Sequence, residues 1–68
     1  MKVDWLDGQP TSGHFVLEMH YENGSRAYLK SLDEQRIANY CSLVRQIPEI
    51  VSVTIYQPEQ WARLAAAA

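Results

Sequence analysis

The segment that decides the fold spans residues 14–31 and reads HFVLEMHYENGSRAYLKS. Polar and apolar residues alternate through its first half, which is typical of a half-buried β-strand. Asn23-Gly24 follows, and both residues tolerate the positive φ that a tight turn requires. A two-residue Asn-Gly loop would pair Leu17 with Lys30 and set a charge opposite the apolar row. A three-residue loop with Gly24 in the left-handed conformation pairs Leu17 with Leu29, and we predict this type I turn with a G1 bulge.

The same register sorts the remaining side chains of the hairpin onto its outer face. It sets Glu18 opposite Tyr28, His20 opposite Arg26 and Val16 opposite Lys30. The inner face, which carries Met19 opposite Ala27, is then left for a helix to cover.

Ser31-Leu32-Asp33-Glu34 has the pattern of a capping box, in which Ser31 and Glu34 satisfy each other's backbone amides. We therefore expect a helix that begins at Leu32 and ends near Ile47, because Pro48 disfavours helical geometry in the residue before it. At 100° per residue, one broad arc of this helix is apolar. The arc holds Leu32, Ile37, Tyr40, Leu43, Val44 and Ile47, with Cys41 at its edge.

Residues 50–56 alternate and are rich in β-branched side chains, which predicts a strand with Val51, Val53 and Ile55 inward. After a strand and a helix, this strand should run parallel to the 26–31 strand through a right-handed crossover. Residues 2–5 suit a short edge strand, and Pro58 can start a short helical turn. The predicted fold class is α+β, a small single-layer mixed sheet in β-β-β-α-β order with one helix packed on one face.

Length and composition indicate one domain at residues 1–64, followed by an alanine tail at 65–68 whose composition is typical of a cloning remnant. The formal charge of −2 comes from eight acids and six bases spread along the chain, which disfavours a nucleic-acid partner. No apolar stretch is long enough for a secretory signal or a membrane span, so neither a membrane partner nor export is expected. Together with the single cysteine, this makes a cytoplasmic location the default expectation.

Candidate catalytic and metal-binding residues each have a simpler interpretation. His14 and His20 share a strand face, but six residues separate them by about 20 Å, too far for one ion. Cys41 lies beside the buried arc of the helix and is interpreted as an inert thiol. Asp33 and Glu34 favour the start of the helix. We expect no metal, no cofactor, no small-molecule ligand and no enzyme activity from the monomer.

The outer face of the sheet, which should have no second helix over it, is the predicted contact surface. Its candidate protein-binding residues are Glu18, His20, Arg26, Tyr28, Lys30 and Tyr56. We expect a non-enzymatic protein-protein interaction module or a small accessory or regulatory protein, with a homodimer through the open sheet face or an edge strand as one form of this hypothesis.

Two other hypotheses about the function stay open. A nucleic-acid-contacting domain would use Arg26, Tyr28, Lys30 and Tyr56, and an enzyme subunit would complete its site across an interface. Trp5 and Trp61 either pack over the small core or anchor a partner.

Overall fold

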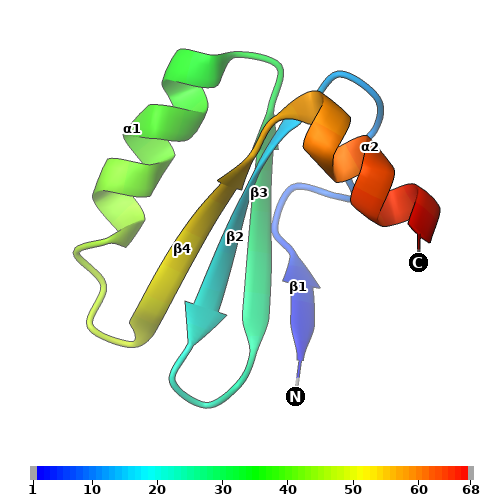
Figure 1. Ribbon diagram of the computed structural model, residues 1–68. Coiled ribbons are helices and arrows are strands. Elements are labelled where there is room, and N and C mark those ends of the chain that lie inside the picture. Colours follow the sequence, from blue (N-terminus) through cyan, green and yellow to red (C-terminus); the bar gives the residue numbers. More distant parts are fainter. Residues whose placement is uncertain (1, 68) are drawn as a thin grey trace.

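The computed structural model describes residues 2–67 and contains a mixed sheet with two helices (Figure 1). The elements follow the order β1 (Val3–Trp5), β2 (Phe15–Tyr21), β3 (Arg26–Ser31), α1 (Glu34–Val44), β4 (Ile50–Tyr56) and α2 (Pro58–Ala67). This arrangement confirms the predicted α+β class. None of the helices in the described residues is both long enough and apolar enough to cross a membrane.

The four strands lie side by side in the order β1-β3-β2-β4. β1 runs parallel to β3, whereas β2 is antiparallel to both β3 and β4. β4 therefore has the same direction as β3, as the crossover predicts, but it pairs with β2 and is separated from β3 by that strand. β1 and β4 are consequently the two edges of the sheet.

The hairpin register agrees with the prediction at every pair that it specified. Leu17 lies opposite Leu29, Met19 opposite Ala27 and Glu18 opposite Tyr28. Gly24 has a φ of 88°, and the Tyr21 amide donates to the Ser25 carbonyl at 2.9 Å. The three-residue loop with a left-handed glycine is thus confirmed.

The core forms between the inner face of the sheet and one stripe of α1. Leu17, Met19 and Ala27 supply the sheet side, and the helix contributes three residues one turn apart: Ile37, Cys41 and Val44. Cys41 is buried, as predicted. Each of these side chains removes apolar surface from water, which is the main favourable contribution to folding.

The predicted start of the helix and the width of its apolar arc are both wrong. Asp33 is the N-cap, with its carboxylate accepting from the Gln35 amide at 3.0 Å. Ser31 cannot cap the helix because it is the last residue of β3, in extended pairing with Phe15. Flat packing against a sheet buries only a narrow stripe of α1, so Leu43 is 64% exposed. The helix ends at Val44, short of the predicted Ile47, which lies in the following loop and is 39% exposed.

At the start of β4, the side chains that point inward differ from the predicted ones. Tyr21 pairs with Ile50 while His20 pairs with Ser52, so Val51 is an extra residue in a bulge. Ile50 therefore packs against the core in place of Val51, which is 64% exposed.

A second helix covers the outer face of the sheet. α2 is longer than the predicted short turn, includes alanines 65–67, and packs across the sheet on the side opposite α1 (Figure 1). Its anchor is Trp61, whose ring lies 5.7 Å from that of Tyr28 and 5.6 Å from that of Tyr56. The expected one-helix, open-faced sheet is corrected to a sheet with a helix on each side.

Candidate functional site

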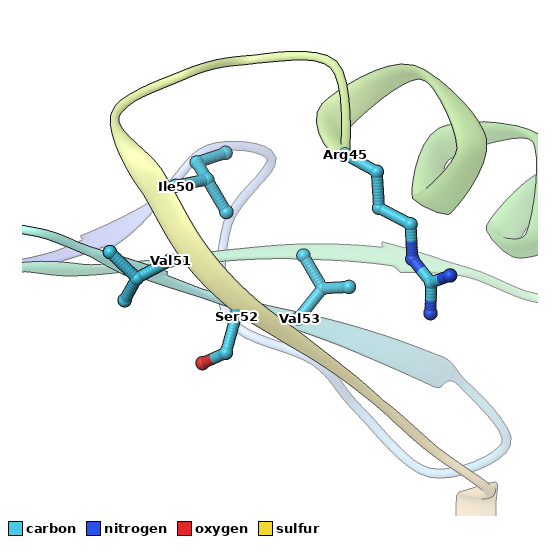
Figure 2. A pocket seen from close by; sticks show the side chains of 5 residues that line it. All are labelled: Arg45, Ile50, Val51, Ser52 and Val53. Carbon is cyan, nitrogen blue, oxygen red and sulfur yellow. The ribbon is translucent and has the colours of Figure 1, made fainter.

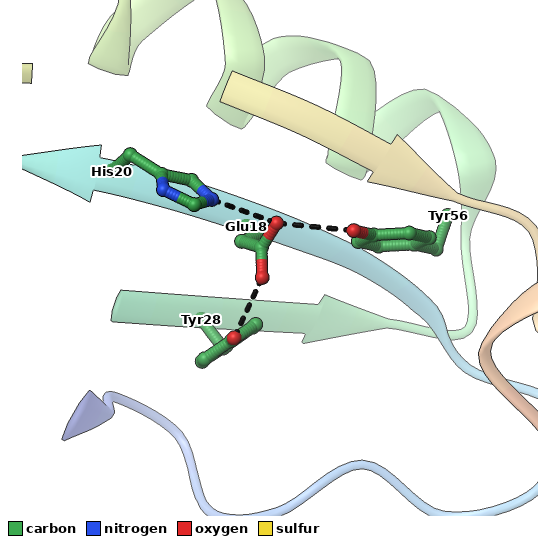
Figure 3. A network of polar contacts seen from close by, with 4 residues as sticks. All are labelled: Glu18, His20, Tyr28 and Tyr56. Carbon is green, nitrogen blue, oxygen red and sulfur yellow. Dashed lines mark hydrogen bonds and ion pairs between the residues drawn. The ribbon is translucent and has the colours of Figure 1, made fainter. Parts of the chain in front are cut away.

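The carboxylate of Glu18 lies at the centre of the outer face and joins three strands (Figure 3). The Tyr28 hydroxyl on β3 donates to its Oε2 at 2.6 Å, and the Tyr56 hydroxyl on β4 donates to its Oε1 at 3.0 Å. Nε2 of His20, two residues along β2, lies 2.9 Å from the same Oε1. Hydrogen bonds to a charged acceptor are stronger than neutral ones, so this cluster fastens β3, β2 and β4 together.

Aromatic rings cover this cluster. Trp5 stacks on Tyr28 with ring centroids 4.4 Å apart and planes 21° apart, and it meets Trp61 edge-on at 6.0 Å. Under these rings Glu18 is only 8% exposed and Tyr28 only 7% exposed. The tryptophans from opposite ends of the chain therefore pack on one another over the outer face, and this packing forms a second small core.

The ionisation of the cluster follows from these contacts. Burial raises the pKa of the Glu18 carboxyl, but hydrogen bonds from Tyr28, His20 and Tyr56 outweigh it and hold that pKa below its ordinary value of 4.5. Burial raises the pKa of both Tyr28 and Tyr56 above 10.0, and the neighbouring Glu18 raises it further. The folded protein thus favours an ionised carboxylate with neutral tyrosines.

A carboxylate that already accepts from three side chains has little capacity left for a substrate or a metal ion. Within residues 2–67, no three His, Cys, Asp or Glu side chains gather as ligands for a metal. His14 is held locally, with Nδ1 3.0 Å from the Thr11 amide. The geometry of the Glu18 cluster is that of a structural hydrogen-bond network that links β2, β3 and β4.

The predicted contact residues do not form one accessible patch. Glu18 and Tyr28 are buried and Tyr56 is half-buried, and both tyrosine rings lie against Trp61. Arg26 is exposed, and Lys30 is half-buried with Nζ 3.4 Å from the Gln9 carbonyl oxygen. Stacking on nucleic-acid bases requires free ring faces. The Tyr28 ring is already stacked on Trp5, so the structure offers no support for the nucleic-acid reading.

Part of the exposed apolar surface lies at the β4 edge. All seven residues of β4 are uncharged, and two of its apolar side chains are exposed: Val51 at 64% and Ile55 at 39%. Arg45 extends from the end of α1 beside Val53, while Ser52 points to the opposite side of the strand and Val51 points away from Arg45 (Figure 2).

Comparisons with family models, curated proteins and solved structures return no match. A function for the chain therefore has to follow from its own geometry.

The backbone of β4 is open to a further strand. Tyr21 donates to Ser25 across the hairpin, and Glu22 donates to the Glu49 carbonyl at 2.9 Å. Odd-numbered residues of β2 therefore direct their backbone groups to β3, and even-numbered ones direct theirs to β4, because these directions alternate along an antiparallel ladder. Ser52 and Thr54, opposite His20 and Glu18, are bonded to β2. The amides and carbonyls of Val53 and Ile55 consequently face the open edge.

The other edge of the sheet is far less suited to pairing. β1 has three residues, and Asp4 stands in the middle of it. Short length and charge are devices by which natural proteins protect an edge strand. From the sequence, an edge strand was one predicted contact surface, but Val51 and Ile55 were predicted to point inward; both are exposed. The uncharged run at 50–56 was the available signal, but strand order was needed to show that it lies at an edge.

Proposed function

We propose that this chain is a non-enzymatic protein-interaction module that binds its partner by adding a strand to β4. The observation that carries the proposal is an uncharged strand of seven residues, paired on one side only. In strand addition, main-chain hydrogen bonds supply affinity and alternate side chains supply specificity. Here Val53 and Ile55 would supply the main-chain groups.

The exposed side chains of β4 support the same proposal. A long, apolar and uncharged edge strand invites association, and natural proteins usually protect such an edge with a charge or a proline. β4 has neither between Ile50 and Tyr56. Its one protective feature is the bulge at Val51, which lies at the start of the strand and leaves Ser52 to Tyr56 in regular pairing with β2.

The contact surface is then the β4 edge and not the outer face of the sheet. The outer face is occupied by Trp61 and its aromatic neighbours, so a partner would have to displace α2 to reach Glu18. The β4 edge requires no such rearrangement. A cytoplasmic location for this activity stays a prediction from the sequence.

A matched pair of lysine variants tests the proposal. Val51 on β4 and Leu43 on α1 are both 64% exposed, so Val51→Lys and Leu43→Lys disturb folding to a similar extent. Each purified variant is first compared with the wild type by circular dichroism and thermal melting. Tagged wild-type, Val51→Lys and Leu43→Lys chains then serve as bait in an extract of the source cells, and hydrogen exchange is measured on the recovered complex.

We expect the wild type and Leu43→Lys to retain the same partner and Val51→Lys to lose it. In the complex, the Val53 and Ile55 amides should exchange more slowly than in the free chain, because they acquire acceptors. Equal recovery by all three baits, or new protection on α1 instead of β4, would show that the β4 edge is not the contact surface.

A further inference from the structure

A groove lies between the end of α1 and the first part of β4, at the open edge of the sheet. The residues that line it are Arg45, Ile50, Val51, Ser52 and Val53. Only Arg45 is charged among these five. It is the C-cap residue of α1, and its side chain extends beside Val53 (Figure 2). Arg45 is exposed, and no acidic side chain within residues 2–67 forms an ion pair with it. An uncompensated positive charge therefore stands next to the β4 edge.

The regular part of β4 decides which side chain of an added strand would meet this charge. Val53 pairs with Met19 and packs against the core, so its side chain lies on the inner face of the sheet, which α1 covers. Residues that lie opposite each other on neighbouring strands direct their side chains to the same face. The residue opposite Val53 in an added strand is thus directed to the inner face, beside Arg45. The bulge at Val51 does not alter this step, because Val53 lies beyond it, in regular pairing with β2.

We infer that the partner strand carries an acidic side chain opposite Val53, where it pairs with Arg45, and an apolar side chain opposite Ile55. This inference rests on the proposed function of the β4 edge. A guanidinium presents a planar fork of donors that matches the two oxygens of a carboxylate. The last carbonyl groups of a helix carry partial negative charge, so a carboxylate at the end of α1 is favourable only with Arg45 to compensate them.

The apolar requirement comes from Ile55. Ile55 pairs with Leu17 and so shares the inner face with Val53, but it is 39% exposed. An apolar residue opposite it would cover this surface, and cross-strand apolar pairs stabilise a sheet. The two requirements fall two residues apart on the partner strand, since Val53 and Ile55 are the β4 residues with outward backbone groups.

The order of the two side chains depends on the direction of the partner strand. Antiparallel pairing is slightly more stable per residue than parallel pairing, so we take the partner to run antiparallel to β4. The apolar residue then comes two positions before the acidic one. The partner motif is apolar-x-acid, read from the amino to the carboxyl end. β4 contains no acidic residue, so β4 of a second copy does not carry this motif.

Selection from a random peptide library tests the motif without a known natural partner. Phage that display random nonapeptides are selected on immobilised wild type, Arg45→Glu and Arg36→Glu, after circular dichroism has shown that all three are folded. Arg36→Glu is the matched control, because both arginines are exposed and both reversals change the net charge equally. Arg36 lies away from β4, in a separate pocket with Lys30 and Tyr40.

We expect the wild type and Arg36→Glu to enrich apolar-x-acid peptides and Arg45→Glu to enrich apolar-x-base peptides. The most enriched wild-type peptide is then synthesised and titrated into each chain by NMR. It should bind Arg45→Glu about fivefold more weakly than the wild type, as expected for an exposed ion pair, and Arg36→Glu with unchanged affinity. Salt should reduce the difference. In the complex, the Val53 and Ile55 amides should become protected from exchange.

The outcomes separate this inference from the proposed function. Enriched peptides that protect the Val53 and Ile55 amides but carry no acid, or that bind Arg45→Glu as well as the wild type, would refute the pairing with Arg45 and leave the β4 edge as the contact surface. Enrichment of acid-x-apolar peptides would overturn the antiparallel direction. Peptides that bind without protecting these amides, or a selection that enriches none, would count against both.

Discussion

Removing one hydroxyl from the buried cluster gives the sharpest test of what holds the outer face together. Tyr28→Phe deletes the 2.6 Å hydrogen bond to Glu18 but keeps the ring that stacks on Trp5. Both partners are more than nine-tenths buried, so water cannot replace the lost donor. Hydrogen bonds to charged groups contribute about 1.5–3 kcal/mol. Glu18 keeps its bonds to Tyr56 and His20, so we expect a loss of about 2 kcal/mol.

For a domain of this size, a loss of about 2 kcal/mol lowers the melting temperature by roughly 8–16 °C. Urea denaturation gives the free energy of unfolding, and Tyr21→Phe is the matched control because Tyr21 lies on the opposite face of β2, away from Glu18. NMR titration of the Glu18 carboxyl should also show its pKa rise in Tyr28→Phe, since one stabilising donor is gone. A loss below about 0.5 kcal/mol, no larger than for the control, would refute the fastening role of this bond.

Three further outcomes are expected. Gly24→Val should destabilise the hairpin by about 2 kcal/mol because a β-branched residue resists the φ of 88°, whereas Gly24→Asn should cost less; equal melting temperatures would contradict the bulge. Asp33→Ala should cost about 1 kcal/mol through loss of the helix cap, as measured by urea denaturation, and a neutral result would place the cap elsewhere. The lowered pKa of Glu18 stabilises the fold above pH 4.5, and this stabilisation is lost as the pH falls through the pKa of Glu18 in the folded protein. The raised pKa values of Tyr28 and Tyr56 stabilise the fold below pH 10.0, and this stabilisation is lost as the pH rises through the pKa values of these tyrosines in the folded protein. Denaturation midpoints across the pH range should therefore fall at both ends, and Glu18→Gln should flatten the acid limb.

The parts of the fold that sequence analysis predicted correctly depend on neighbours along the chain. The hairpin register follows from Gly24 and from the match of side chains a few residues apart, such as Leu17 with Leu29. The α+β class follows from the alternation of strand and helix patterns in the same way. These local signals need no knowledge of distant contacts.

The errors arose where a distant contact decides between local options. Ser31 and Asp33 can both cap a helix, and the pairing of Ser31 with Phe15 leaves the role to Asp33. α2 is held by Trp61 against residues from β1, β3 and β4, which no local pattern reveals. Its presence buries Glu18 and Tyr28, and it moves the candidate contact surface from the outer face to the β4 edge.

Hydrogen exchange of the β4 amides, measured on the free chain and on the chain in the complex recovered from the extract, tests the central claim most directly. The amides of Ser52 and Thr54, which are bonded to β2, should be protected in both states. The amides of Val53 and Ile55 should exchange freely in the free chain and become protected in the complex. If these two amides exchange equally fast in both states, β4 is not the contact surface.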